Sequence, residues 1–344
     1  LMATTDFYPW EGEYSSEASM LPELCDKQAV QGFARTFQPA VYLLLSPLGI
    51  VGNGLVLLTR YRQARSVTDV CLLHLAVSDL LLILTLLFAT INTLQGWSLS
   101  TATCKALQGL HALNFYNGFL FLTCISVDRY VAIVRVSAAR RLRPRARRHG
   151  WLTAGLAWLL AVLLALPQFI YSQIQHHQGL RLCRVVFPRA VSRAARGATN
   201  LVQVVFGFVV PFVVMASCYA AVARTLLAAR GAQPHRALRV LVALVLVFVV
   251  LQLPHSLMVL LDTAELLASW ETSCAQSRSK DLALLVTGGL AYLRCCLNPV
   301  LYAFLGQRFR RELWLLARDA GCVRFLYPRC SGCPSPRRRT SLST

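Results

Sequence analysis

Long apolar runs separated by short polar stretches dominate the pattern of this chain. Each run is close to or longer than the about 20 residues that an α-helix needs to cross the hydrocarbon core of a bilayer. The predicted membrane helices cover residues 40–60, 70–95, 102–134, 150–171, 197–228, 237–268 and 281–305. The pattern therefore predicts an all-α membrane protein built as a bundle of seven transmembrane helices.

The segments outside these runs are too short to bury a core of their own. We expect an extracellular tail at 1–39, the membrane bundle at 40–305 and a cytoplasmic part at 306–344. Within 308–318, apolar residues recur at helical spacing opposite arginines. This predicts a short amphipathic helix on the membrane lipid after the seventh span, followed by the C-terminal tail.

Composition and charge support the membrane class. The mean hydropathy is +0.52 and only 15% of the residues are charged. A net charge of +20 could indicate nucleic-acid binding, but the basic residues gather in short loops, at 60–65, 135–148, 224–239 and 308–339. This distribution follows the positive-inside rule and places the C-terminus in the cytoplasm. We expect a multi-pass plasma membrane protein with an extracellular N-terminus, targeted by its first helix, and no nucleic-acid partner.

Polar residues inside the runs are candidate functional residues. Asp79 lies within a hydrocarbon-length run, where an acid is costly, so an ion-binding or switching role is favoured over a structural one. Asn53 follows Gly49 and Gly52, small residues that let helices approach closely around one amide. We expect a polar core around these side chains.

Two motifs indicate a family. Asp128, Arg129 and Tyr130 stand where the third run reaches the cytoplasm, and an acid beside an arginine there must pair or face water. An ordinary helix end with Arg129 reaching the headgroups is the alternative. However, the whole run 128–134 and the Asn-Pro-x-x-Tyr motif at 298–302 resemble the rhodopsin-like G-protein-coupled receptors.

That resemblance covers nearly the whole chain and includes Trp158 and Pro211. It implies that Arg129 is held by its neighbouring acid at rest and meets a G protein on activation. The coupling and switch residues that it implies are Asp128, Arg129, Tyr130, Tyr219, Asn298, Pro299 and Tyr302.

Four of the 12 cysteines are expected outside the cell: Cys25, Cys104, Cys183 and Cys274. An even set in an oxidising compartment indicates two disulfides. The family resemblance implies a Cys104–Cys183 bridge. A second bridge, Cys25–Cys274, is typical of chemokine receptors.

The segments 21–25, 94–99, 251–254 and 295–299 extend the resemblance to the C-C chemokine receptors. It implies a CC chemokine ligand, of the epithelial kinds found in skin and mucosa. It also implies a Gi-type heterotrimeric G protein, calcium release and chemotaxis, with arrestin and receptor kinases as further partners.

The chain departs from the family pattern at three places. Thr85 is not followed by the usual proline two residues later, Gln252 replaces the tryptophan two residues before Pro254, and Gly288 replaces a glutamate in the seventh helix. We expect a helix-six switch at Gln252 and Pro254, with the Gln252 amide hydrogen-bonded to a neighbour. The acidic anchor for a ligand's basic N-terminus would then come from elsewhere, and Asp262 is the candidate.

Arg294 lies four residues before Asn298, so both project from one face of the seventh helix. The family resemblance turns that face towards Asp79, where many members hold sodium. We expect an Asp79–Arg294 ion pair in place of the sodium ion. The alternative is that Arg294 faces a water-filled cavity and pairs with carbonyl groups.

The acidic tail is the candidate for ligand capture, because chemokines are commonly basic and opposite charges steer association. Its expected ligand-binding residues are Tyr8, Glu11, Glu13, Tyr14 and Glu17. The two tyrosines stand in a setting for sulfation. A solvated tail with unmodified tyrosines is the alternative.

Other classes fit less well. We find no nucleophile with a base, no metal-ligand spacing and no cofactor motif, so we do not expect an enzyme. A transporter is disfavoured because no inverted repeat is visible. A retinal pump would need a lysine deep in a helix, but the lysines are Lys27, Lys105 and Lys280. A scavenging receptor without G-protein coupling is disfavoured by the intact motif at Arg129.

Overall fold

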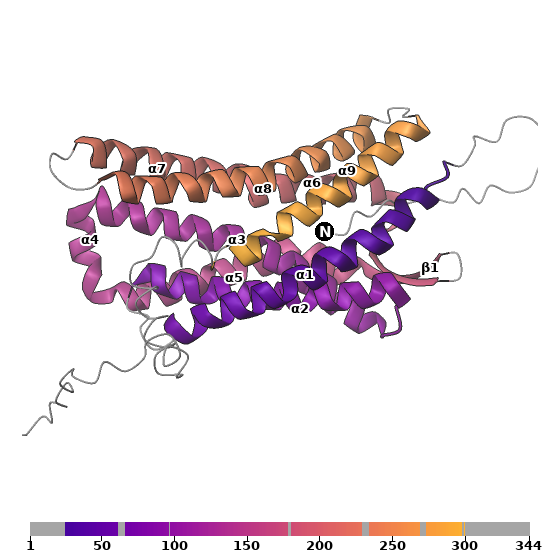
Figure 1. Cartoon of the computed structure of the whole chain (residues 1–344), viewed down its shortest axis with the longest axis horizontal. Helices are drawn as coiled ribbons and strands as arrows, with labels where there is room; N and C mark the ends of the chain where they lie inside the picture. The colour runs from indigo at the N-terminus through magenta and orange to yellow at the C-terminus, as the bar shows by residue number, and fades with distance from the viewer. Residues whose placement is uncertain are drawn as a thin grey trace, which may run out of the picture.

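The structure is a computed structural model that describes residues 25–60, 66–95, 97–177, 180–228, 234–268, 273–297 and 299. Long helices run alongside one another in a bundle (Figure 1). They are α1 (Gln28–Arg60), α2 (Val67–Gln95), α3 (Thr101–Ile133), α5 (Ala146–Tyr171), α8 (Pro234–Ala268) and α9 (Cys274–Tyr292), with the fifth span formed by α6 (Ser192–Val204), η3 (Val205–Val209) and α7 (Val210–Ala228).

Short elements mark the two ends of the bundle. At one end a hairpin pairs β1 (Ser172–His177) with β2 (Leu180–Val185) in antiparallel register. At the other end, α4 (Val136–Leu142) and η1 (Arg143–Arg145) join α3 to α5, and Figure 1 shows α4 opposite the hairpin. The remaining short turn is η2 (Arg189–Val191), which precedes α6.

The predicted seven-helix bundle is confirmed. Six helical segments of the described part are long and apolar enough to cross a membrane, and α9 provides the seventh helix. Large apolar side chains point away from the bundle, for example Leu58 at 67% and Leu156 at 68% exposure. Such faces would be unfavourable in water but suit contact with lipid tails.

Several helices begin earlier than their apolar runs predict. The first starts at Gln28 instead of 40, so residues 28–39, which we expected in the tail, are helical. The seventh starts at Cys274 instead of 281. The length of an apolar run reflects the thickness of the hydrocarbon layer. A helix can continue beyond that layer with polar residues. The expected surface helix and C-terminal tail lie outside the described residues.

Helix α3 lies at the centre of the packing. One buried cluster joins Phe119 of α3 to Ala161 of α5 and Met215 of α7. A second joins Phe121 of α3 to α2 and α5, through residues that include Leu75. Since α3 contributes to both clusters, it can transmit a displacement to the second, fourth and fifth spans.

The fifth span contains a wide helical turn. Residues Val205–Val209 form a π-helix, and Pro211 follows within the next turn. Proline has no backbone N–H, so regular α-helical hydrogen bonding is interrupted here. Such π-turns are common at functional sites, and this one lies beside Phe115 of α3, which lines a cavity described below.

Candidate functional site

A three-residue clasp closes the cytoplasmic end of α3. Arg129 Nη2 lies 2.8 Å from Asp128 Oδ2, and the two side chains are 40% and 20% exposed. The hydroxyl of Thr68, at the start of α2, accepts hydrogen bonds from Arg129 Nε at 3.1 Å and Nη2 at 2.7 Å. The same hydroxyl donates to Asp128 Oδ2. Thr68 therefore ties the ion pair to α2, a role that the sequence did not indicate.

Tyr219 is held against α3 by a second interhelical contact. The Ser126 hydroxyl lies 2.6 Å from Tyr219 Oη and also donates to Leu122 O at 2.8 Å. Because that hydroxyl has a single proton, Tyr219 can donate its own proton to Ser126 when the carbonyl takes the serine proton. Either arrangement links α7 to α3 one turn above Tyr130, which packs in the same cluster.

Asn53 connects α1 to the segment after α9. Its Nδ2 donates to Gly49 O and to Cys295 O, each at 3.0 Å. The amide is 1% exposed, so both bonds form away from bulk water. Pro299 is buried in the same part of the chain, whereas Asn298 and Tyr302 lie outside the described residues.

The expected Asp79–Arg294 ion pair stays a prediction. Both residues are buried, at 1% and 6% exposure. Arg294 extends to α3, with Cζ 4.6 Å from the centroid of the Phe119 ring. Gly118 makes this possible, since a Cβ at that position would lie 1.7 Å from Arg294 Nη1.

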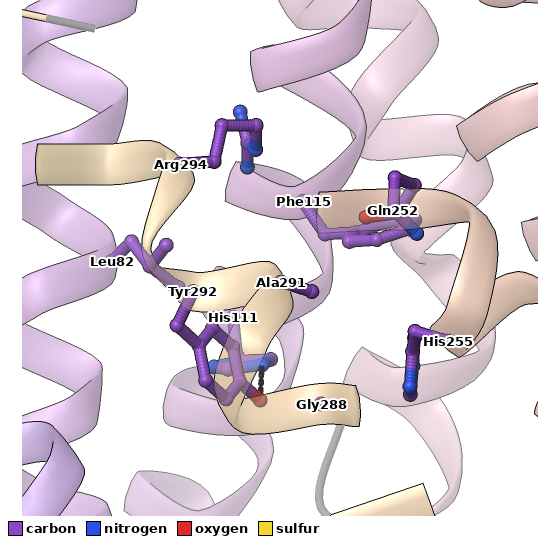
Figure 2. Close-up of a pocket in the computed structure, with 9 residues that line it drawn as sticks. All are labelled: Leu82, His111, Phe115, Gln252, His255, Gly288, Ala291, Tyr292 and Arg294. Atoms are coloured by element: carbon purple, nitrogen blue, oxygen red, sulfur yellow. Dashed lines mark hydrogen bonds between the residues drawn. The ribbon is translucent and has the colours of Figure 1, made fainter. Parts of the chain in front are cut away.

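A cavity lies between α2, α3, α8 and α9 (Figure 2). Its wall combines apolar residues with polar ones that reach in from three helices. The described lining is Leu82, His111, Phe115, Gln252, His255, Gly288, Ala291, Tyr292 and Arg294. It contains one arginine and two histidines but no Asp or Glu, so the wall carries no negative charge.

His111 joins three helices through a directed chain of hydrogen bonds. Thr85 donates its hydroxyl proton to Leu82 O at 2.7 Å, so it accepts from His111 Nδ1 at 3.3 Å. His111 Nε2 is then the acceptor for Tyr292 Oη at 3.1 Å, the contact drawn in Figure 2. The chain runs from α9 through α3 to α2, although Thr85 lacks the usual neighbouring proline.

Gln252 and Gly288, two of the three departures from the family pattern, line the cavity. Gln252 is 3% exposed and its Nε2 donates to Ser256 Oγ at 3.3 Å, which confirms the expected hydrogen bond. Pro254 lies inside α8 between these residues. At Gly288 a Cβ would still be 3.7 Å from His255 Cε1, so the glycine leaves open space beside the histidine.

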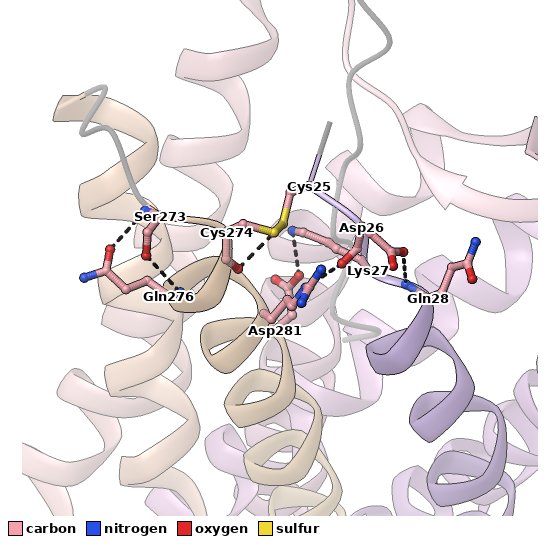
Figure 3. Close-up of a disulfide and its surroundings, with 9 residues drawn as sticks. Cys25, Asp26, Lys27, Gln28, Ser273, Cys274, Gln276 and Asp281 are labelled. Atoms are coloured by element: carbon pink, nitrogen blue, oxygen red, sulfur yellow. Dashed lines mark hydrogen bonds and ion pairs between the residues drawn. A yellow bond between two sulfur atoms is a disulfide. The ribbon is translucent and has the colours of Figure 1, made fainter. Parts of the chain in front are cut away.

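Two disulfides close the outer end of the bundle, as expected. Cys104–Cys183 ties the start of α3 to β2, and Cys25–Cys274 ties the residues before α1 to the start of α9. Figure 3 shows the second bridge beside an ion pair between Lys27 and Asp281, with a separation of 2.7 Å. The chain before α1 is thus fixed to α9 twice.

Asp262 is not an unpaired acidic anchor. Its carboxylate contacts Arg196 of α6 at 3.2 Å and Lys280 of α9 at 3.0 Å. Lys280 also pairs with Glu265. These contacts bind the outer ends of the fifth, sixth and seventh spans, a network that appears only when the three helices are packed together.

The expected ligand-binding residues of the tail, Tyr8, Glu11, Glu13, Tyr14 and Glu17, lie outside the described residues. Among the residues that are described, no three His, Cys, Asp or Glu side chains gather as a metal site would require.

Known proteins resemble this chain along almost its whole length. The family described as 7 transmembrane receptor (rhodopsin family) matches residues 52–302. The C-C chemokine receptor type 10 of Mus musculus is 52% identical over 339 residues, and that of Homo sapiens is 53% identical; each match covers 98% of this chain and 93% of the relative. The Homo sapiens C-C chemokine receptor type 6 is 41% identical, covering 91% of this chain and 84% of the relative. The chain therefore belongs to the rhodopsin family of seven-transmembrane receptors and, within it, to the C-C chemokine receptors, which are multi-pass plasma membrane proteins and not enzymes.

Proposed function

We propose that this receptor responds to CC chemokines of the kinds made by skin and mucosal epithelia and activates a Gi-type G protein, leading to calcium release and chemotaxis. The observation that supports G-protein activation is the clasp of Asp128, Arg129 and Thr68. It holds an arginine at the cytoplasmic surface by contacts that a small rotation of α3 against α2 can break. Free Arg129 can then contact the G protein.

Ligand capture is assigned to the outer end. The stretch before Cys25 contains Asp6, Glu11, Glu13, Glu17 and Glu23 without a lysine or arginine. A basic chemokine is attracted to such a segment over about a Debye length. The carboxylates of Asp262 and Asp281 are already paired with internal cations, so they supply less free negative charge than the tail does.

Activation follows as a shift between two arrangements of the helices. A chemokine can contact the tail, the β1–β2 hairpin and the cavity between α2, α3, α8 and α9. It favours one arrangement only if it binds that arrangement more tightly than the other. The cavity wall includes Gln252 of α8 and Tyr292 of α9, so a ligand there can displace both helices. The clasp at Arg129 would report the displacement at the opposite end.

A panel of CC chemokines tests the function directly. Cells expressing the receptor should show inhibition of cyclic AMP formation and calcium release with the epithelial ligands, and pertussis toxin should abolish both. The variant Arg129→Gln should remain at the cell surface and bind ligand but lose signalling, whereas Arg140→Gln, at an exposed position in α4, should signal normally. Full signalling by Arg129→Gln would contradict the coupling role, and silence towards every CC chemokine would contradict the ligand assignment.

Signal termination is assigned to the C-terminal tail. The serine and threonine residues of its last segment, 335–344, are Ser335, Thr340, Ser341, Ser343 and Thr344, set among arginines. Phosphorylation by receptor kinases would add negative charge there and create a docking site for arrestin. Replacing all five by alanine should reduce arrestin recruitment after chemokine addition without reducing calcium release.

A further inference from the structure

A cluster of exposed arginines covers the segment that joins α3 to α5. Its members are Arg135, Arg140, Arg141, Arg143, Arg145, Arg147 and Arg148. In the part of the chain that the structure describes, none of these guanidiniums pairs with a carboxylate. The sequence explains this, because no Asp or Glu stands between Asp128 and Asp262. The positive-inside rule accounts for basic residues on this side, but it leaves the charge of the cluster available to an anionic partner.

The cluster lies where the helices meet the membrane surface. Figure 1 shows α4 crossing the end of the bundle opposite the hairpin. Arg147 and Arg148 belong to the first turn of α5, and Trp151 follows them by four and three residues, so the three side chains share a face. Trp151 is 46% exposed, the neighbouring Leu152 is 56% exposed, and the Trp151 ring packs edge-on against His74 of α2 with centroids 5.1 Å apart. Tryptophan is typical of the membrane–water interface, so this face places the two guanidiniums at the level of the lipid headgroups.

The chemistry of the cluster favours phosphate groups. A guanidinium binds a phosphate through two parallel N–H···O bonds, which makes arginine well suited to this anion. A headgroup with several phosphates holds more negative charge in one place than a headgroup with a single net charge, so it can contact several guanidiniums at once. Exposed apolar side chains stand among the arginines, with Val136 at 46% and Leu142 at 45% exposure. Such side chains suit contact with the membrane surface rather than with a soluble polyanion.

We propose that residues 135–148, together with Trp151, bind the headgroup of a polyphosphorylated inositol lipid of the inner leaflet. The arginines contact the phosphates, and the apolar side chains keep the segment at the membrane surface. The site faces the cytoplasm, so it does not depend on which chemokine binds at the outer end.

Native mass spectrometry of the purified, full-length receptor in detergent, without chemokine or G protein, tests the site by measuring the first bound lipid. The receptor should retain phosphatidylinositol bisphosphate at about tenfold lower concentration than phosphatidylserine. Equal retention of the two lipids would overturn the proposal, because it would show charge attraction without recognition of the phosphates. Inositol trisphosphate, which has no acyl chains, should bind at least about tenfold more weakly than the bisphosphate lipid. Equal binding of this soluble anion would overturn the lipid as the partner.

Two matched double variants connect the effect to the cluster. Arg147→Gln with Arg148→Gln should weaken retention of the bisphosphate lipid by about tenfold or more, since each arginine near an anionic surface contributes about fivefold. Arg35→Gln with Arg181→Gln removes two exposed arginines of α1 and β2, and should leave retention unchanged. An unchanged retention in the first variant, or an equal loss in both, would rule out the cluster as the binding site.

A second pair of arginines keeps the test decisive if the first variant cannot be purified. Arg143→Gln with Arg145→Gln, in the turn before α5, removes the same charge from the cluster. This variant should also weaken retention of the bisphosphate lipid by about tenfold. Retention equal to that of the unmodified receptor would overturn the proposal in the same way.

Discussion

An arginine near or inside a bilayer is unfavourable unless other groups stabilise its charge. Two arginines of this receptor are stabilised in different ways. Arg129 is half exposed and pairs with Asp128 while Thr68 supports both. Arg294 is buried and lies over Gly118 and Phe119. The first arrangement can open towards the cytoplasm, whereas the second lies inside the helix bundle.

Thr68→Val should raise basal signalling. The valine keeps the branched shape but removes the hydroxyl that bonds to Asp128 and Arg129, so the resting clasp loses three hydrogen bonds. Basal inhibition of cyclic AMP formation, corrected for surface expression, measures the effect. Thr59→Val is the matched control, since Thr59 bonds only within its own helix in the described structure. Equal basal activity in the two variants would contradict a role for Thr68.

Gln252→Leu should alter basal signalling or lower the free energy of unfolding by about 1 kcal/mol. The change removes the amide that bonds to Ser256 and leaves that buried hydroxyl without this partner. Thermal unfolding and basal cyclic AMP measure the two outcomes. Adding Ser256→Ala should recover part of any loss. No change in either quantity would make Gln252 a passive replacement for the usual tryptophan.

Helix α3 is the element through which the ends of the bundle communicate. Its outer end is bound to β2 by the Cys104–Cys183 disulfide, and its middle bears His111. Its inner end bears Ser126, bonded to Tyr219 of α7, and the clasp at Arg129. A rotation of α3 therefore affects the cavity, the fifth span and the cytoplasmic surface together.

The contact between Ser126 and Tyr219 should contribute about 1 kcal/mol to the resting receptor. Tyr219→Phe and Ser126→Ala should each lower the unfolding temperature and change agonist efficacy. Because each change breaks the same bond, the double variant should lose less than the sum of the single losses. Strictly additive losses would show that the two side chains act separately.

At the scale of the whole molecule, covalent and ionic contacts hold the outer end while the inner end is closed by a weaker clasp. Cys25–Cys274 and Lys27–Asp281 fix the chain before α1 to α9, and Asp262 holds α6 and α9 to α8. The outer frame therefore positions the ligand surface, and the inner clasp provides the movable part.

Replacing Cys25 and Cys274 together by serine should lower the unfolding free energy by about 2–4 kcal/mol, because the bridge joins residues 249 apart and limits the unfolded chain. Chemokine affinity should also fall, since the tail is no longer fixed to α9. Thermal unfolding and ligand binding measure these effects. Peptide mapping without reductant should show the two cysteines joined in the unmodified receptor, and free thiols there would contradict the bridge.

Neutralising Glu11, Glu13 and Glu17 to glutamine should slow chemokine association and leave dissociation nearly unchanged. High salt should shrink the difference, because exposed charges are screened beyond about 10 Å at 0.1 M. Surface plasmon resonance at two salt concentrations measures both rates. An unchanged association rate in low salt would exclude steering by the tail.

Much of the architecture could be predicted because it depends on features that are local in sequence. The seven apolar runs, the basic loops and the Asp128-Arg129-Tyr130 motif each indicate their role from neighbouring residues alone. The disulfides followed from an even number of outer cysteines together with the family resemblance. The predicted helix ends were less accurate, because polar residues extend the helices beyond the hydrocarbon layer.

Only the tertiary structure decided which side chains meet across helices. The sequence placed Arg294 and Asp79 in a common core, but the missing Cβ of Gly118 opens space on α3 and the guanidinium occupies it. Likewise, Asp262 looked available until packing placed Arg196 and Lys280 beside it, and Thr68 gained its role from α3. Hydrophobic periodicity determines which face of a helix is buried, whereas helix rotation and the volume of facing side chains determine each polar partner.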